Sequence, residues 1–300
     1  MNGPRLVLVD GYAQVYRAFY AIPGLTAPDG RPTNALYGVI RLLLKLDQEL
    51  PGGRGVVIFD CGRPQRRMDL LPDYKANRPP MPDALRAQLP ELDQWLEALG
   101  WPVLRQEGRE ADDVIAAVAM AREGAETAIV THDKDLMQLV VERDVYLVQT
   151  GAKGALDRIG PAEVEAKFGV APGQIRDYLA LLGDSSDNIP GVPGVGAKTA
   201  AALLKQFGSA EALLARIAEV AKPGIRKSLE ENRNLLLRNL DLVRLDLDLP
   251  PDWRGLDALR RRPLDGPRLQ DMAAACGFRS LAPVLAEAAR PASQPSLFGF

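Results

Sequence analysis

The chain has 300 residues, a hydrophobic share of 47% and a formal net charge of -2. This length can bury a sizeable core in one large domain or two. The nearly neutral charge argues only weakly against a nucleic-acid partner, because the distribution of charge over a surface matters more than the sum.

Two cysteines, Cys61 and Cys276, exclude a disulfide framework and a cysteine zinc pattern. The single histidine, His132, excludes a mechanism built on a pair of histidines. No apolar run reaches membrane-spanning length, and the apolar stretch 6–9 is too short for a signal peptide. We therefore expect a protein of the reducing cytoplasm that does not enter a membrane.

Three short apolar runs predict buried strands that each deliver an aspartate at or just past the carboxyl end. They are Leu6–Asp10, Val56–Asp60 and Ala128–Thr131, the last leading into Asp133 and Asp135. A helical pattern follows each run, so the strands should be parallel. Because open α/β sheets bind ligands at the carboxyl ends of their strands, these aspartates should share one crevice.

A helix should begin after Gly108, where Glu110, Asp112 and Asp113 precede an apolar run. Acids in a first turn are also ordinary helix chemistry, since they favour the positive end of the helix dipole. Together with the strand aspartates, however, they would form a cluster of seven carboxylates that repel one another. Such a cluster is tenable when hard cations bind, which predicts Mg²⁺ or Mn²⁺.

The segments between these strands read mainly as amphipathic helices. The pattern after Asp10 holds Arg17 among aromatic residues, which can stack on a base or belong to the core. Further helices are predicted at 35–50, 84–99 and 136–140, with strands at 103–104 and 145–149.

Residues 61–82 form a basic segment that leaves directly from Asp60. It carries Tyr74 together with the cations Arg63, Arg66, Arg67, Lys75 and Arg78. A basic loop is usually a solvated face, but here it begins at the mouth of an anionic pocket. It can hold phosphates that the carboxylates alone would repel.

A second module begins near Pro161. A helix at 175–182 ends in a loop that carries Asp184 and Asp187. A glycine-rich turn follows and opens the helix at 200–207; its residues include Gly191, Gly194, Gly196, Lys198 and Thr199. Bare N–H groups at such a turn favour an anion, and the spacing is not that of a nucleotide-triphosphate loop. A duplex phosphate backbone fits this turn better.

The C-terminal part predicts an edge strand at 245–249, where apolar and acidic residues alternate, and closing helices at 269–276 and 281–288. The tail from Pro291 is expected to be disordered. The chain has 37 basic and 39 acidic residues. If nine of the acids bind metal, 30 acids remain and the rest of the chain carries a net charge of +7.

The motifs together resemble the bacterial 5′-3′ exonuclease and flap-endonuclease family, in particular the 5′ nuclease domain of DNA polymerase I. The resemblance runs from about Leu6 to about Pro283 and rests on the stretches LVDG, FD at 59–60, DYKANRPPMP, EADDVI, THDKDLMQL and GDSSDNIPGVPGVGAKTA. It implies an α/β fold in which a PIN-like nuclease domain has a mostly parallel central sheet, a helical arch at about 61–82 and a helix-three-turn-helix DNA-binding module. The implied boundaries are a nuclease domain at 1–170, a DNA-binding domain at 171–240, a C-terminal segment at 241–290 that packs back on the nuclease domain, and a tail at 291–300.

The resemblance also implies roles for single residues. The first metal group would be Asp10, Asp60, Glu110 and Asp112, with Asp113 shared or outside it; the second would be Asp133, Asp135 and Asp187, with Asp184 beside it. Lys75 and Arg78 match the basic pair that contacts the scissile phosphate, and Tyr74 matches a residue beside the threaded strand. The turn at 191–199 would contact duplex DNA, often with a bound K⁺.

The expected activity is hydrolysis of DNA phosphodiesters with two metal ions, giving 5′-phosphate products from branched or 5′-flap DNA. The protein would act in replication or repair as a monomer. Two alternatives remain open: a non-catalytic DNA-structure binder or clamp adaptor, and a PIN-type ribonuclease. The tail residues Gln294, Leu297 and Phe298 resemble the short peptide by which bacterial proteins bind the sliding clamp.

Overall fold

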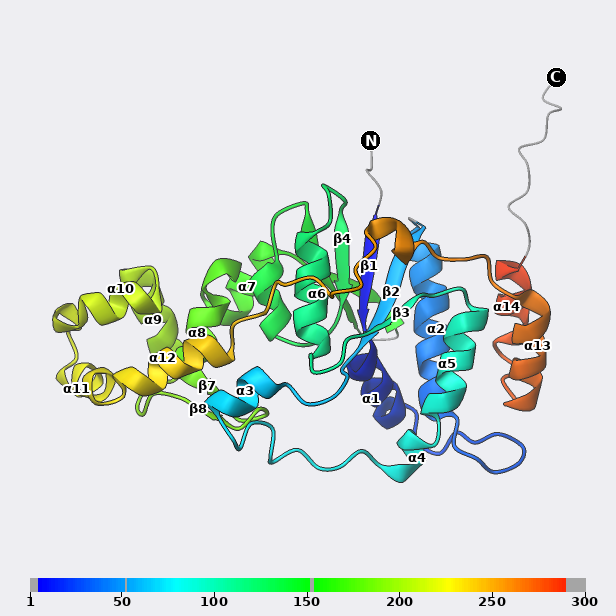
Figure 1. Ribbon diagram of the computed structural model, residues 1–300, viewed down its shortest axis with the longest axis horizontal. Helices are drawn as coiled ribbons and strands as arrows, with labels where there is room; N and C mark the ends of the chain where they lie inside the picture. The colour runs from blue at the N-terminus through cyan, green and yellow to red at the C-terminus, as the bar shows by residue number, and fades with distance from the viewer. Residues whose placement is uncertain (1–4, 52, 152–153, 290–300) are drawn as a thin grey trace, which may run out of the picture. The chain divides into compact units, whose positions relative to one another are not determined.

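The structure is a computed structural model that describes residues 5–51, 53–151 and 154–289 (Figure 1). The chain forms two compact units. The first comprises the described residues up to Asp10, then Ile58–Pro80 and Arg105–Trp253; the second comprises Gly11–Val57, Met81–Leu104 and the residues from Arg254 onward.

Six strands form the main sheet in the order β3-β2-β1-β4-β5-β6. Their bounds are β1 Leu6–Asp10, β2 Arg54–Phe59, β3 Val103–Arg105, β4 Thr127–Val130, β5 Val145–Thr150 and β6 Leu156–Ile159. The pair β1·β4 is parallel, as predicted. The pair β4·β5 is also parallel, whereas β6 joins the edge of β5 in the antiparallel direction. All five residues of β1 are buried, which is why its first four residues are apolar; the fifth is Asp10.

The first unit also holds the helix α6, Ala111–Met120, which packs against β1. Every residue from Val114 to Ala119 on this helix is buried. A helical part follows, with α7 Pro161–Phe168, α8 Ile175–Leu182, α9 Ala197–Phe207, α10 Ala210–Ala215, α11 Pro223–Glu231 and α12 Arg233–Leu242. Figure 1 shows α9–α12 grouped at one end of this unit, and α8 packs on both α9 and α12.

The second unit is helical apart from its share of β2 and β3. Its helices are α1 Gly11–Ala21, α2 Asn34–Glu49, α4 Asp83–Arg86, α5 Leu89–Ala98, α13 Gly266–Ala275 and α14 Ala282–Ala288. The apolar stripe of α2 is buried, including Leu36, Ile40 and Leu43, and α5 contributes the fully buried Trp95. These residues form the core of this unit.

Three predicted elements were wrong in detail. The stretch 245–249 is not a strand, because its backbone groups bond to side chains: the N–H of Asp246 donates to Asp113. The helix after Asp135 is a 3-10 helix, Asp135–Leu139. The helix predicted at 84–99 is divided into α4 and α5 around Gln88, whose side chain accepts from the N–H groups of Ala35 and Leu36.

None of the helices among the described residues is long and apolar enough to cross a membrane.

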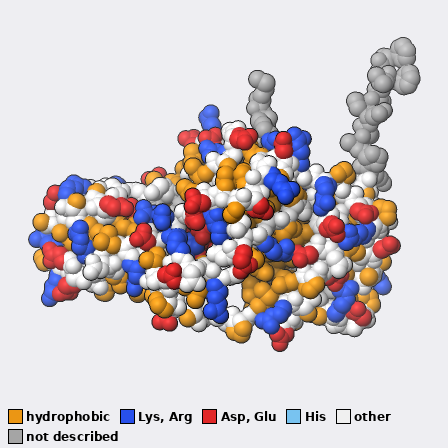
Figure 2. Space-filling view, viewed as in Figure 1, with side chains coloured by type: hydrophobic (Ala, Val, Ile, Leu, Met, Phe, Trp, Pro, Cys, Tyr) orange, Lys and Arg blue, Asp and Glu red, His pale blue; other side chains and the backbone are white. Residues whose placement is uncertain are grey.

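On the face drawn in Figure 2, basic and acidic side chains are interspersed over the helical part formed by α9–α12. This face therefore carries charges of both signs and is not a single acidic field.

Candidate metal and nucleic-acid site

Two strand-end carboxylates are fixed by hydrogen bonds from neighbouring elements. Asp10 ends β1 and is 5% exposed, and its Oδ2 accepts from the hydroxyl of Thr131 at 2.8 Å. Asp60 follows β2, and its Oδ1 accepts from the backbone N–H of Ala111 at 2.9 Å. Asp60 thereby caps the first turn of α6, because the first N–H groups of a helix have no partner within the helix.

Electrostatics connects Asp10 with the carboxylates of α6 and of the loop after β4. Burial, together with the negative charges of Asp133 and Asp10, raises the pKa of Asp112 well above its usual value. Burial also raises the pKa of Asp133, although the N–H of Asp135 donates to its Oδ1 and opposes the shift. These acids therefore lie close enough to disfavour one another's charge.

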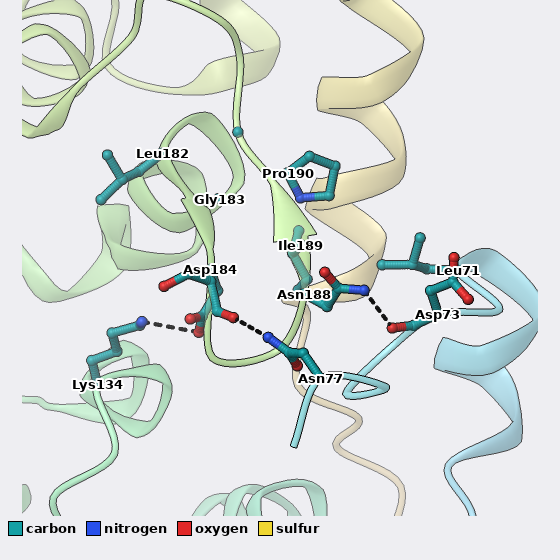
Figure 3. Close-up of a pocket in the computed structure, with 12 residues that line it drawn as sticks. Leu71, Asp73, Asn77, Lys134, Leu182, Gly183, Asp184, Asn188, Ile189 and Pro190 are labelled. Carbon is teal, nitrogen blue, oxygen red and sulfur yellow. Dashed lines mark hydrogen bonds and ion pairs between the residues drawn. The ribbon is translucent and has the colours of Figure 1, made fainter. Parts of the chain in front are cut away.

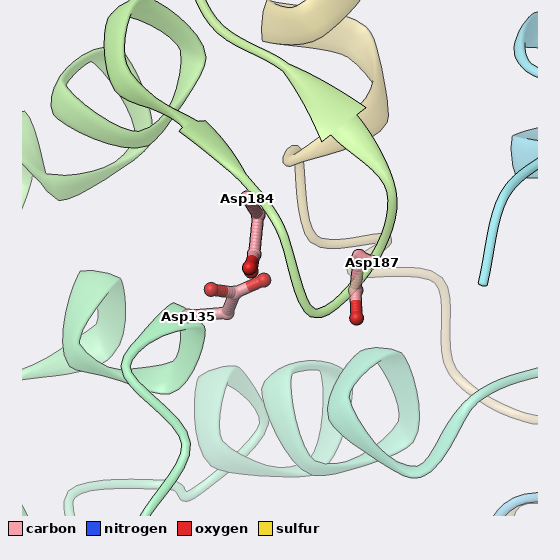
Figure 4. Close-up of side chains that lie close together, drawn as sticks. All are labelled: Asp135, Asp184 and Asp187. Atoms are coloured by element: carbon pink, nitrogen blue, oxygen red, sulfur yellow. The ribbon is translucent and has the colours of Figure 1, made fainter. Parts of the chain in front are cut away.

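Asp135, Asp184 and Asp187 form the tightest carboxylate group among the described residues (Figure 4). One oxygen from each lies within 4.8 Å of the others. The Oδ1 atom of Asp135 is buried and has no hydrogen-bond partner in the structure. Burial and the charges of Asp133, Asp184 and Asp187 raise the pKa of Asp135 well above its usual value.

Asp184 is held differently from Asp135. Its Oδ1 accepts from the backbone and hydroxyl of Ser186, and its Oδ2 pairs with Lys134 Nζ at 2.9 Å. Burial opposes ionisation of Asp184, but the bonds from Ser186 and Lys134 prevail and lower its pKa. A carboxylate of raised pKa thus lies beside one of lowered pKa.

Glu110 and Asp113 both face the guanidinium of Arg67. Glu110 is the residue before α6, and one of its oxygens accepts from Arg67 while the other accepts from Lys75. Both oxygens of Asp113 accept from Arg67, at 2.6 and 2.8 Å. Arg67 is 5% exposed, so it is a buried residue here and not a surface cation.

The segment 71–78 lies directly against the acidic residues. The backbone N–H of Lys75 donates to the carbonyl of Asp187 at 3.0 Å, and Arg78 forms an ion pair with the Asp187 carboxylate. The hydroxyl of Tyr74 donates to Asp187 at 3.0 Å and lies 3.2 Å from Glu110. Lys75 has a φ of 57°, a backbone conformation that non-glycine residues seldom adopt.

A cavity of about 810 Å³ opens beside this segment (Figure 3). It is lined by residues of three segments: Leu71, Asp73 and Asn77; Lys134; and residues 182–185 and 188–191 of a hairpin. The two strands of this hairpin are β7, Gly183–Asp184, and β8, Ile189–Pro190. Asn77 donates to the carbonyl of Ser185, and Asn188 donates to the carbonyl of Asp73. The basic segment and the hairpin that carries Asp184 and Asp187 are therefore held together from both sides.

The glycine-rich turn contains positions with different environments. At Gly191 a Cβ would lie 2.0 Å from the carbonyl oxygen of Leu182, so close backbone packing requires glycine. At Gly196, the residue before α9, a Cβ would meet nothing within 4 Å. Gly194 has a φ of 78°, Lys198 is exposed and Thr199 is half-buried.

The other predicted site residues are spread over the chain. Arg63 is exposed, and half-buried Arg66 donates to the carbonyls of Asp241 and Arg244. Arg17 is exposed on α1 in the second unit. The residues Gln294, Leu297 and Phe298 lie outside the described part of the chain.

Sequence reasoning missed three polar residues that hold the acids. They are Thr131, Lys134 and Ser186. Each lies within three residues of a predicted metal carboxylate, and that proximity was the available signal.

Comparisons with known proteins agree along the chain. The model of the 5′-3′ exonuclease N-terminal resolvase-like domain matches residues 5–169, and that of the 5′-3′ exonuclease C-terminal SAM fold matches residues 170–266. The chain is 38% identical over 296 residues to a 5′-3′ exonuclease of Aquifex aeolicus, covering 98% of this chain and 99% of the relative. It is also 44% identical over 261 residues to DNA polymerase I of Pseudomonas aeruginosa, covering 84% of this chain and 28% of that protein.

Solved structures share the fold at lower identity. A zinc-bound T5 5′-exonuclease matches with a TM-score of 0.67 and 22% identity, covering 95% of this chain and 98% of that one. The catalytic core of Rad2 in complex with DNA substrate matches with a TM-score of 0.62 and 18% identity, covering 96% and 93%. These matches and the resolvase-like family model confirm the predicted PIN-like α/β fold with a mostly parallel sheet.

The chain spans about a third of the length of the DNA polymerase I relatives, from 28% to 36%. It spans nearly the whole of the Aquifex aeolicus exonuclease. The two family models and this relative together show that the chain belongs to the 5′-3′ exonuclease family.

Proposed function

We propose that the protein is a divalent-metal-dependent 5′ nuclease that hydrolyses DNA phosphodiesters at 5′ ends and 5′ flaps, leaving 5′-phosphate products. The observation that carries this proposal is the group formed by Asp135, Asp184 and Asp187, which lies against the basic side chain of Arg78. Family membership supports it, because the Aquifex aeolicus relative of nearly equal length is named a 5′-3′ exonuclease.

The carboxylates fit a divalent cation. The Oδ1 atom of Asp135 is buried without a hydrogen-bond partner, and the donor set consists of oxygen atoms, which Mg²⁺ and Mn²⁺ prefer. Asp135, Asp184 and Asp187 would hold one ion, with Asp133 beside them. Asp10, Asp60, Glu110 and Asp112 would hold another. T5 exonuclease structures that share this fold contain divalent metal ions, which supports a metal-dependent activity but does not identify the ligands.

When bound, such ions supply a nucleophilic hydroxide near neutral pH and a Lewis acid for the phosphate oxygens. The protein's own contribution is positioning and charge. Lys75 and Arg78 would stabilise the negative charge that develops on the phosphate, since preorganised cations in a poorly hydrated site act strongly. Tyr74, which already donates to Asp187, would orient that carboxylate.

The DNA duplex would lie on the turn at 191–199, where Gly196 leaves open space before α9 and Lys198 is exposed. A K⁺ ion at this turn belongs to the proposal. Arg17, Arg63 and Arg66 would contact phosphates outside the metal site. The corresponding domains are the nuclease part at 1–170, the DNA-binding part at 171–240 and the segment at 241–290.

Three further expectations complete the proposal. The protein would act as a monomer in the cytoplasm near the nucleoid. Its tail, through Gln294, Leu297 and Phe298, would bind the sliding clamp.

The test is cleavage of end-labelled 5′-flap DNA, single-stranded RNA and blunt duplex with Mg²⁺. We expect the wild-type protein to cut the flap and Asp135→Asn to abolish cleavage while flap binding survives. The matched control is Asp252→Asn, which removes an exposed carboxylate outside the cluster. Flap cleavage by Asp135→Asn at the wild-type rate would contradict the metal assignment, and cleavage of RNA alone would replace DNA as the substrate.

A further inference from the structure

Arg67 lies at the centre of a buried hydrogen-bond network in the first unit. It belongs to the short helix α3, Gln65–Leu70, and its guanidinium is almost inaccessible to solvent. Its Nε donates to the carbonyl of Leu242 at 3.0 Å, and Nη2 lies 3.3 Å from the carbonyl of Arg244. The remaining donors contact Glu110 and Asp113. A guanidinium has five N–H donors, and these contacts use all of them.

Both carboxylate oxygens of Asp113 also have hydrogen-bond donors. Its Oδ2 accepts from Arg67 Nη1, and its Oδ1 accepts both from Arg67 Nη2 and from the backbone N–H of Asp246 at 2.9 Å. This is a bidentate pair, the strongest geometry for an arginine and a carboxylate. Glu110, by contrast, gives Arg67 a single oxygen, so its other oxygen can turn to a different partner.

We propose that Arg67 is a positioning residue that fixes the Glu110 carboxylate for a divalent ion, and that Asp113 is its counter-ion and not a metal ligand. The same guanidinium ties the first turn of α6 to the segment 242–246, which follows α12. This inference rests on the proposed function. It assigns Arg67 a role other than the contact with DNA that its sequence position suggested.

The neighbouring cations show why this role falls to Arg67. Arg66, on the same helix, also donates to backbone carbonyls of the segment after α12 but contacts neither Glu110 nor Asp113 in any described bond. Lys75 contacts Glu110, but its side chain keeps 21% of its surface exposed against 6% for Arg67. The Lys75 side chain can therefore move from Glu110 to a phosphate. The Arg67 guanidinium is held in place by Glu110, by Asp113 and by backbone carbonyls.

The experiment measures Mn²⁺ binding by electron paramagnetic resonance on the full chain, with a thermal melt of each variant. The informative variant is the double substitution Arg67→Met with Asp113→Asn, because removing both charges leaves no unpaired buried ion. We expect it to fold and to bind Mn²⁺ about 10- to 100-fold more weakly, the usual effect of losing a residue that orients a ligand. Arg66→Met is the matched control and should bind Mn²⁺ as the wild type does.

The single variant Asp113→Asn tests whether Asp113 is the counter-ion of Arg67 or a metal ligand. The amide oxygen can still accept from Arg67 and Asp246, so we expect a much smaller loss of Mn²⁺ affinity than in Glu110→Gln. Equal losses in these two variants would overturn the proposal, because Asp113 would then be a ligand. Wild-type Mn²⁺ affinity in the double variant would overturn it as well.

Arg67→Lys covers the case in which the double variant does not fold. It keeps the charge but loses the planar fork, so it should fold and lower both Mn²⁺ affinity and kcat while the KM for flap DNA stays unchanged. A raised KM with unchanged kcat and Mn²⁺ affinity would make Arg67 a DNA contact and overturn the proposal. Mn²⁺ binding by a wild-type protein that cuts no flap would reject the proposed nuclease function and leave this inference standing.

Discussion

Replacing Asp135 with asparagine should stabilise the metal-free protein. One oxygen of Asp135 lies within 4.8 Å of an oxygen of Asp184 and of Asp187. At that separation and an effective dielectric constant of about 20, like charges repel by roughly 3.5 kcal/mol per pair. Lys134 offsets part of this repulsion, and protonation of the cluster relieves more. We therefore expect Asp135→Asn to raise the free energy of unfolding by about 1–3 kcal/mol at pH 8 in EDTA.

The dependence on pH follows from the raised pKa of Asp135. The folded protein holds this proton more tightly than the unfolded chain, whose carboxyl group titrates near 3.8. The stability of the metal-free wild type therefore falls as the pH rises from about 4 through the raised pKa. In Asp135→Asn this loss is smaller, so the two proteins should differ least near pH 4 and most in alkaline solution.

Thermal melts by circular dichroism in EDTA and in Mg²⁺ test this prediction, with Asp252→Asn as the control. Saturating Mg²⁺ should reverse the order, because an ion that binds the folded state at 100 times its Kd stabilises it by about 2.7 kcal/mol. A metal-free Asp135→Asn that melts below the wild type at pH 8 would refute the reasoning. A wild-type Tm that is the same in EDTA and in Mg²⁺ would also refute it.

Three further changes test other parts of the molecule. Lys75→Ala should slow single-turnover cleavage of flap DNA by about 10²- to 10³-fold and weaken duplex binding much less, and equal losses would make Lys75 only a docking charge. Gly191→Ala should lower the free energy of unfolding in urea by at least about 1–3 kcal/mol, because its Cβ would lie 2.0 Å from the Leu182 carbonyl, whereas Gly196→Ala meets nothing within 4 Å and should unfold near the wild-type midpoint. Deleting residues 291–300 should abolish binding to the sliding clamp, measured by surface plasmon resonance, and leave cleavage unchanged. Undiminished clamp binding would show that the tail is not the clamp-binding peptide.

Much of the fold was readable because buried parallel strands leave an unmistakable pattern. Residues 6–9 are all apolar since both faces of β1 are covered, and Thr127–Val130 is likewise buried along its whole length. The parallel pairing of these two strands brings Asp10 within reach of Thr131, as the sequence suggested for the carboxyl ends. The alternation of apolar and acidic residues at 245–249 wrongly predicted a strand, because the backbone there bonds to side chains instead of a neighbouring strand.

The candidate site was harder to predict in its basic residues than in its acids. Arg67 and Arg66 are adjacent and chemically equal in the sequence, yet one is buried and the other half-exposed. The partners of Arg67 lie 43, 46 and 175 residues away, so local pattern carries no information about them. An arginine was therefore assigned to solvent and DNA by default, since buried arginines are rare.

The cap that Asp60 places on α6 has a consequence for how the chain reaches its native state. A helix N-terminus carries about half a positive charge, and the acids Glu110, Asp112 and Asp113 gather around it. Arg67 and Lys75 add full positive charges to the same neighbourhood, because both pair with Glu110. The folding chain thus supplies counter-charges of its own for the acids at this end of the helix.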